Sequence, residues 1–569
     1  MRGLLPIAAA MALAAPGPRA APADRRLPLL EAMTAELGRT AQRMRLSGYE
    51  PPYFASFQLK EVEAVQLAGR YGAVFEDQSR RERKLLADVR VGSYELDSSG
   101  PDEMGMMLGP EHQTYFASRD APLDDDPASL RNALWLLADE KYKEALASYF
   151  KKKGKGVYKA DDPDRAPSFS REEPRRHVDP PARFLFDRER WAREIRTTTQ
   201  AFRGHPAIFD SSMRVSAEHQ VRWFTSTEGT ALVTEATLYA VHVQAVTRAV
   251  DGQLLESSRD FYAPSEAQLP GPAELRSEVA RLIGELEALR TAPVLDPYTG
   301  PAILAPEATG VLFHEAVGHR LEGERLEDEK EGQTFKGQLG NLVLPDFLSV
   351  VDDPGLAAQG GTPLNGRYDY DDQGVPGQRT VLVRDGRLEG YLLSRKPVHP
   401  FTRSNGHGRS QGARPPVARM ASLVVTSRRQ VSMAELKRML IAEARRQGKP
   451  YGLLIQDIAG GNTNTMTYGY QAFKGTPRMV FRVDAATGKE ELVRGVELVG
   501  TPLTSVNKVL ATGDEVRVFN GYCGAESGFV PVSTVAPAAL VAEVELQRVA
   551  RTSGRGPVLP SPWSESPTR

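Results

Sequence analysis

The chain has 569 residues, of which 41% are hydrophobic, 25% charged and 7% aromatic, and these fractions are typical of globular proteins. They exclude a chain that is disordered throughout, and the length is sufficient for two or three domains with separate hydrophobic cores. Lysine and arginine total 72 and aspartate and glutamate 73, a net charge of -1 that provides no general attraction to nucleic acid or to anionic membranes.

Residues 1–23 have the pattern of a secretory signal peptide. A basic residue precedes an apolar run over 4–15, and Ala21 and Ala23 place small side chains three and one residues before a cut. The apolar run is shorter than the ~20 residues that a membrane-spanning helix needs, and no later segment approaches that length. We therefore expect a mature chain that begins near Asp24, has no membrane span and is periplasmic or secreted.

A first α+β domain is expected over residues 24–291. Apolar residues recur at helical spacing in several segments, and alternating or β-branched runs lie between them. In chain order, the pattern predicts a helix over 27–46, strands over 53–59, 63–68 and 86–96, a helix over 128–150, strands within 213–246 and a helix over 272–289. The stretch 158–183 is rich in Pro, Asp and Arg and is expected to be a long surface loop or insertion.

A Pro-rich linker is expected over residues 292–301, between the first domain and a β-rich second domain over 302–553. The fold class is therefore α+β with two domains, a mixed α/β domain followed by a β-rich domain. The Pro- and Ser-rich tail, 554–569, is expected to be disordered.

Short β-rich runs dominate the second domain. Asp385-Gly386 predicts the tight turn of a hairpin between 379–383 and 388–393, because this pair tolerates positive φ. The one clear later helix is expected over 433–446.

The strongest chemical motif is His314-Glu315-x-x-x-His319, in a chain with nine histidines. In the usual zinc-hydrolase pattern two histidines four residues apart lie roughly 40° from each other on a helix. A spacing of five residues separates them by about 140° on a regular helix, so both could reach one metal ion only if the helix is irregular. We therefore predict a π-type bulge, or a break near Gly318, between Glu315 and His319.

Zinc chemistry assigns a role to each residue of this motif. His314 and His319 would bind zinc, and Glu315 would take a proton from a bound water and pass it to the leaving amine. A third protein ligand is required if one position stays open for water and substrate. Two candidates remain: Glu322, three residues beyond His319, and Cys523, the only cysteine, in the Gly-rich segment 520–528.

The alternative to a metal site is structural: a buried helix with hydrogen-bonded histidines, and an inert buried cysteine. Two further Gly-rich turns carry donors that could contact an oxyanion or a peptide carbonyl, one with His407 and Arg409 and one with Tyr468 and Tyr470. Ordinary turn structure is the alternative for both.

These motifs resemble the TldD/PmbA family of metallopeptidases. The likeness covers about residues 295–544 and depends on four segments in order. They are His314 to Glu324, the segment Asp371-Asp372-Gln373-Gly374-Val375-Pro376-Gly377-Gln378, the segment Pro415-Pro416-Val417-Ala418-Arg419-Met420, and Cys523-Gly524 with Val530-Pro531-Val532.

The resemblance implies that His314, His319 and Cys523 bind zinc, which favours Cys523 over Glu322 as the third ligand. It also implies a dimer whose active site lies in a channel that admits unfolded or extended peptides and binds their backbone by strand addition. The partner would be a second copy or a related subunit, and a chain that keeps both histidines resembles the catalytic type.

The sequence therefore predicts an exported metallopeptidase with one Zn2+ per chain that hydrolyses flexible or unfolded peptides. One alternative is a zinc hydrolase that acts on another amide or on an ester. A second is a non-proteolytic maturation or binding subunit in which zinc is structural and Glu322 could be a fourth ligand.

Overall fold

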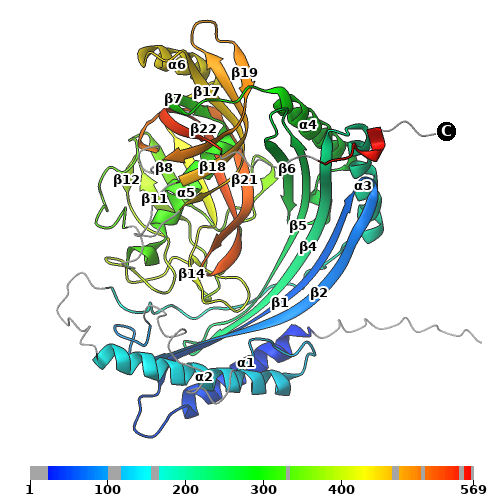
Figure 1. Cartoon of the computed structure of the whole chain (residues 1–569). Helices are drawn as coiled ribbons and strands as arrows, with labels where there is room; N and C mark the ends of the chain where they lie inside the picture. Colours follow the sequence, from blue (N-terminus) through cyan, green and yellow to red (C-terminus); the bar gives the residue numbers. More distant parts are fainter. Residues whose placement is uncertain are drawn as a thin grey trace, which may run out of the picture.

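The computed structural model describes residues 24–99, 117–154, 166–327, 333–463, 473–500, 506–549 and 557–564 (Figure 1). The expected signal peptide, residues 1–23, lies outside the described residues. None of the helices in the described part of the chain combines the length and the apolar character that a membrane crossing requires.

The first half of the chain forms a six-stranded sheet with the order β2-β1-β4-β5-β3, in which β6 also pairs with β5. Figure 1 shows its four long strands curving together past the second half of the chain. The strands are β1 Pro52–Arg70, β2 Ala73–Val91, β3 Arg176–Val178, β4 Ile208–Ser226, β5 Ala231–Arg248 and β6 Leu254–Ala263. The long neighbours are antiparallel, and β3 is parallel to β5.

Four helices cover one face of this sheet. They are α1 Arg26–Arg43, α2 Pro127–Gly154, α3 Arg188–Gln200 and α4 Pro272–Thr291. Side chains alternate along a strand, so Phe57, Leu59 and Leu67 of β1 lie on the same face of the sheet. Phe57 and Leu59 share a core with α1 and α2, and Leu67 shares a core with α3 and α4. The two helix pairs therefore lie near opposite ends of the long strands (Figure 1).

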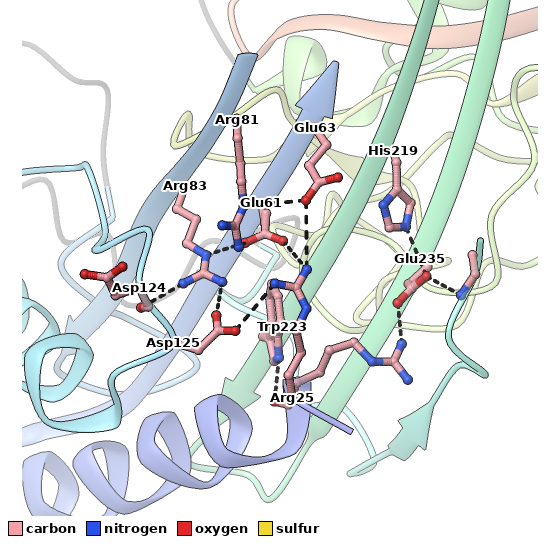
Figure 2. Close-up of polar contacts among 12 residues, drawn as sticks. Arg25, Glu61, Glu63, Arg81, Arg83, Asp124, Asp125, His219, Trp223 and Glu235 are labelled. Carbon is pink, nitrogen blue, oxygen red and sulfur yellow. Dashed lines mark hydrogen bonds and ion pairs between the residues drawn. The ribbon is translucent and has the colours of Figure 1, made fainter. Parts of the chain in front are cut away.

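A buried carboxylate organises the end of the sheet next to α1 (Figure 2). The Glu61 side chain is 1% exposed and is in contact with Arg25 at 3.0 Å, Arg81 at 2.8 Å and Arg83. Arg83 also donates to the backbone oxygen of Asp124 at 3.1 Å. These contacts fix the start of α1 and the segment before α2 to β1 and β2.

The second half of the chain forms a twelve-stranded sheet. Its main order is β12-β11-β8-β15-β22-β20-β18-β17-β7, with β16, β19 and β21 attached. The strands are β7 Tyr298–Leu304, β8 Leu348–Asp352, β11 Thr380–Arg384, β12 Arg387–Leu388, β15 Ser422–Ser427, β16 Gln430–Val431, β17 Tyr451–Thr463, β18 Phe473–Asp484, β19 Glu490–Val493, β20 Val496–Gly500, β21 Val509–Ala525 and β22 Gly528–Arg548. Two short pairs lie outside it: β9 Ala358–Gln359 with β10 Thr362–Pro363, and β13 Gly408–Arg409 with β14 Val417–Ala418.

Two helices cover opposite faces of the second sheet. Ala302 and Leu304 of β7 belong to the core around α5 Pro306–Ala316, whereas Ile303 belongs to the core under α6 Met433–Arg446. The central part of β22, residues 532–541, is therefore buried on both faces.

The two sheets meet through buried charges. Lys60 of β1 and Arg222 of β4 project from the face opposite the helices and contact Asp372 Oδ1 at 2.9 and 2.8 Å. Lys60 also donates to the backbone oxygen of Ser410 at 2.6 Å, and Gln58 to that of Asp372 at 2.8 Å. These bonds hold the curved sheet against the loops of the second half of the chain.

The α+β fold class is confirmed, with a β-rich second half that carries α5. The helices expected over 128–150, 272–289 and 433–446 are present as α2, α4 and α6. The turn at Asp385-Gly386 has the expected positive φ angles of 47° and 77°. The division into domains at 24–291 and 302–553 stays a prediction.

Several expected boundaries were wrong. The opening helix ends at Arg43, and the strands expected over 53–59 and 63–68 are one continuous β1. The strand expected over 86–96 ends at Val91. The expected linker 292–301 contains the start of β7, because Tyr298 pairs with Leu546 of β22.

Two segments expected to lack regular structure contain ordered contacts. The expected loop 158–183 includes β3, which pairs with the start of β5. In the expected disordered tail, residues 557–564 are described, and the ring of Trp563 lies 4.8 Å from the guanidinium of Arg203.

Candidate metal centre

The helix that carries the histidine motif is irregular where the spacing requires it. Helix α5 ends at Ala316, Val317 follows with φ -115° and ψ -55°, and a 3-10 turn runs over Gly318–Leu321. This break is the irregularity expected between Glu315 and His319. It turns the two imidazoles toward each other, with ring centroids 5.0 Å apart and ring planes at 88°.

The structure brings His314, His319 and Cys523 into one buried group. The Sγ atom of Cys523 lies 3.2 Å from His314 Nε2 and 3.3 Å from His319 Nε2. Cys523 comes from β21, where it pairs with Val530 of β22, so a contact across 204 residues of chain depends on the β21–β22 hairpin.

This group fits a zinc ion. Tetrahedral zinc, with bonds of ~2.0 Å to nitrogen and ~2.3 Å to sulfur, keeps its nitrogen and sulfur ligands roughly 3.5 Å apart. The two measured N–S separations, 3.2 and 3.3 Å, are close to that value. Imidazole and thiolate are both ligands that zinc binds, and a catalytic zinc site has three protein ligands with the fourth position open to water or substrate.

Glu322 lies on the other side of His319, where it cannot share a metal ion with the three ligands. Its Oε2 accepts a hydrogen bond from His319 Nδ1 at 3.2 Å, and from Arg325 Nε at 2.7 Å. A ligand histidine commonly donates its second ring N–H to a carboxylate in this way. Glu322 thus faces the second ring nitrogen of His319, and the group of three possible ligand atoms contains Cys523 instead.

Burial and charge oppose each other within this group. Burial alone would raise the pKa of the Cys523 thiol, but the two neighbouring imidazoles hold that pKa well below its usual value. Burial lowers the pKa of His319, but Glu322 and Cys523 reverse this and raise it well above the ordinary value. The thiolate form of Cys523, which binds metal ions, is therefore favoured.

Glu315 lies beside the group, at the surface of a cleft that it lines together with His314. It is 7% exposed, and burial raises the pKa of its carboxyl group. Its backbone oxygen accepts a hydrogen bond from Arg320 Nη1 at 2.7 Å, which holds the last turn of α5 against the 3-10 turn.

The cleft has a volume of about 810 Å³ and lies between the two halves of the chain. Residues of β6 and α4 line one side, and residues of α5, β17, β18 and β21 line the other. Tyr262 of β6 and Tyr522 of β21 meet edge to face, with centroids 6.2 Å apart. The predicted metal centre is thus open to a space large enough for a segment of polypeptide.

Two of the other predicted site residues, His407 and Arg409, do not line this cleft. His407 is fully buried, with Nδ1 2.9 Å from Asn405 Oδ1 and Nε2 3.1 Å from Asp352 Oδ1. Arg409 donates to the backbone oxygens of Met420 and Pro531 at 2.6 and 2.8 Å. Both residues therefore stabilise turns rather than facing the cleft, and Tyr468 and Tyr470 lie outside the described residues.

Arg419 is the neighbour of this site that the residue pattern did not single out. It is fully buried and donates to the backbone oxygen of Cys523 at 2.6 Å. Arg419 belongs to the segment 415–420, which resembles a family segment. Nothing in that segment by itself indicates a contact with Cys523, 104 positions away.

The comparisons with known proteins agree with this site. The family described as "PmbA/TldA metallopeptidase C-terminal domain" matches residues 297–548. Residues 297–548 are therefore similar to the C-terminal domain of the TldD/PmbA family. It is 29% identical over 287 residues to a metalloprotease of Archaeoglobus fulgidus, which is 50% of this chain and 61% of that one. It is 31% identical over 270 residues to a metalloprotease TldD homolog of Haemophilus influenzae, 45% of this chain and 51% of that one.

The fold of the whole chain is also that of a family structure. TldE from Thermococcus kodakarensis matches with a TM-score of 0.59 at 13% identity, covering 91% of this chain and 100% of that one. The sequence matches cover less of each protein than the structural match does. The chain spans about half the length of the curated relatives that it matches.

Proposed function

We propose that this protein is a zinc-dependent metallopeptidase that hydrolyses flexible or unfolded peptides. The observation that carries the proposal is the convergence of His314 Nε2, His319 Nε2 and Cys523 Sγ beside Glu315, at the surface of a large cleft. The metalloprotease names of the relatives support the same reaction class.

In this proposal the three side chains His314, His319 and Cys523 hold one zinc ion. Zinc bound there would lower the pKa of a water molecule toward neutrality and polarise a peptide carbonyl. Glu315 accepts the proton of the attacking water and transfers it to the nitrogen of the leaving amine. Its raised pKa suits both steps, because such a carboxyl group takes up and releases a proton nearer neutral pH.

An extended peptide is the substrate that suits this cleft. Strand β21 pairs with β22 along one edge, and among the described residues its other edge pairs only at Thr512 and Gly513, with β16. Residues 517–522 of this edge line the cleft and offer backbone groups to a substrate strand. Most backbone groups of a folded protein are already paired within its own structure, so a flexible or unfolded segment fits this edge better.

Export and assembly belong to the same proposal. The pattern over residues 1–23 supports a periplasmic or secreted protein. The similarity to TldE supports a dimer with a second copy or with a related subunit.

The decisive experiment compares the purified chain with Glu315→Gln and Cys523→Ala for metal content and for cleavage of denatured casein. We expect one zinc per wild-type chain, a Glu315→Gln variant that keeps zinc but loses cleavage, and a Cys523→Ala variant that binds zinc weakly. Zinc without cleavage of any peptide in a panel would favour the non-proteolytic subunit or a hydrolase of another amide or ester. A wild-type chain that binds no metal would contradict the proposal.

A further inference from the structure

One buried arginine contacts the surroundings of two of the three metal-binding residues. Arg419 lies between β14 and β15, and its backbone N–H donates to the His407 oxygen at 2.9 Å. Its side chain is fully buried. A buried guanidinium requires several partners because an unpaired buried charge is strongly destabilising.

The outer end of the guanidinium holds the hairpin that carries Cys523. Nη2 donates to the Cys523 backbone oxygen at 2.6 Å. Nη1 donates to Ser527 Oγ at 2.9 Å and to the Gly528 oxygen at 3.0 Å. Because Cys523 and Gly528 lie on the two strands β21 and β22, these bonds join both strands at the hairpin end and fix where Sγ lies.

The inner nitrogen of the same guanidinium faces Glu322. Arg419 Nε lies 3.6 Å from Glu322 Oε1, and each of these two buried atoms lacks a hydrogen bond within the described residues. The second oxygen of Glu322 accepts from His319 Nδ1 at 3.2 Å. Arg419 therefore adds a second positive charge, besides that of Arg325, beside the carboxylate that orients His319.

We propose that Arg419 is the positioning residue of the metal centre: it sets the location of Cys523 Sγ through the hairpin, and the orientation of His319 through Glu322. The inference rests on the proposed zinc site. Groups that orient the ligands of a metal commonly change its affinity by 10- to 100-fold when they are replaced.

The test measures metal binding and does not depend on catalysis. Arg419→Met removes the guanidinium and keeps an unbranched buried side chain. Arg395→Met is the matched control, because Arg395 is also buried, at 2% exposure, and its bonds go to Ser170 and Glu228, away from the metal centre. Zinc affinity is measured by competition with a chelator, and cobalt-loaded protein is examined for the thiolate-to-cobalt charge-transfer band.

We expect Arg419→Met to bind zinc about 10- to 100-fold more weakly than wild type and to lose intensity in the charge-transfer band. Arg395→Met should bind zinc with wild-type affinity and keep the band. If Arg419→Met does not fold, Glu322→Gln tests the His319 arm and Ser527→Ala the hairpin arm, and each should weaken zinc binding.

Four results separate this inference from the proposed function. The positioning role alone would be overturned if Arg419→Met kept wild-type zinc affinity and an unchanged charge-transfer band. The same result in both Glu322→Gln and Ser527→Ala would also overturn it. An equal loss of affinity in Arg395→Met would also overturn it, since the effect would then be general. A wild-type chain without metal affinity would overturn both, whereas metal binding that depends on Arg419 in a chain without peptidase activity would overturn only the enzymatic proposal.

Discussion

Gly318 and Met420 pack so closely that a Cβ atom at position 318 would lie 2.0 Å from Met420 Sδ. Gly318 begins the 3-10 turn that follows α5, and Met420 is fully buried. The absence of a side chain at 318 therefore allows the chain to turn sharply between the two histidines of the motif.

Gly318→Ala should consequently destabilise the protein through overpacking. We expect the free energy of unfolding to fall by about 1–3 kcal/mol, measured by urea denaturation. A shorter side chain at 420 should relieve the clash, so the double variant Gly318→Ala/Met420→Ala should be more stable than the sum of the single effects predicts. Strict additivity would show that the contact does not limit position 318.

Removal of the metal should lower the stability of the folded chain, since a ligand that binds only the native state stabilises it. Zinc at 100 times its dissociation constant contributes about 2.7 kcal/mol. We expect a chelator to lower the midpoint of thermal unfolding and added zinc to restore it. The same chelator should have a smaller effect on Cys523→Ala, and an unchanged midpoint in the wild type would contradict a bound metal.

The buried contact between the sheets gives a prediction on stability. Asp372→Asn would leave Lys60 and Arg222 without their shared carboxylate, and an uncompensated buried charge typically costs about 3–5 kcal/mol. Asp369→Asn is the control, because Asp369 is 53% exposed and pairs with an exposed Arg367, so its loss should change stability by less than about 1 kcal/mol. Equal effects in the two variants would exclude a special role for the buried contact.

Glu235 should contribute to loss of stability in acid (Figure 2). Burial raises the pKa of its carboxyl group, but the hydrogen bond from His219 and the charge of Arg26 outweigh this and hold the pKa below the ordinary value. A carboxyl group whose pKa is lower in the folded state stabilises the protein above its unfolded pKa of about 4.3 and loses this contribution as pH falls through the folded pKa.

At pH values below about 4.3, we therefore expect the urea midpoint of the wild type to decrease more steeply with falling pH than that of Glu235→Gln. The variant has no carboxyl group at position 235 to titrate. Parallel pH profiles for the two proteins would contradict the assignment. The comparison isolates one carboxyl group among many because both proteins share all the others.

Much of the architecture could be predicted from local pattern. Helix α6 has the predicted bounds, Met433–Arg446, because its buried residues recur at helical spacing and Ser432 caps its N-terminus through the Glu435 N–H. The long strand β22 was harder to recognise, since residues 532–541 are buried on both faces and show no alternation of apolar and polar residues.

The sequence by itself determined the candidate metal-binding motif and the break that this candidate requires in its helix. The five-residue spacing of His314 and His319 is incompatible with one metal on a regular helix, and Gly318 marks where the chain can turn. Local chemistry could not choose between Glu322 and Cys523, because both residue types can bind zinc.

Only the tertiary structure shows which of these atoms meet. Pairing of β21 with β22 brings Cys523 to the Nε2 atoms of both histidines, while Glu322 meets the opposite nitrogen of His319. Arg419 likewise makes its side-chain hydrogen bonds through contacts that span 104 residues or more, between segments with no local relation. Spacing along the chain reveals which side chains share a helix face, but strand register and the packing of distant loops determine which atoms meet.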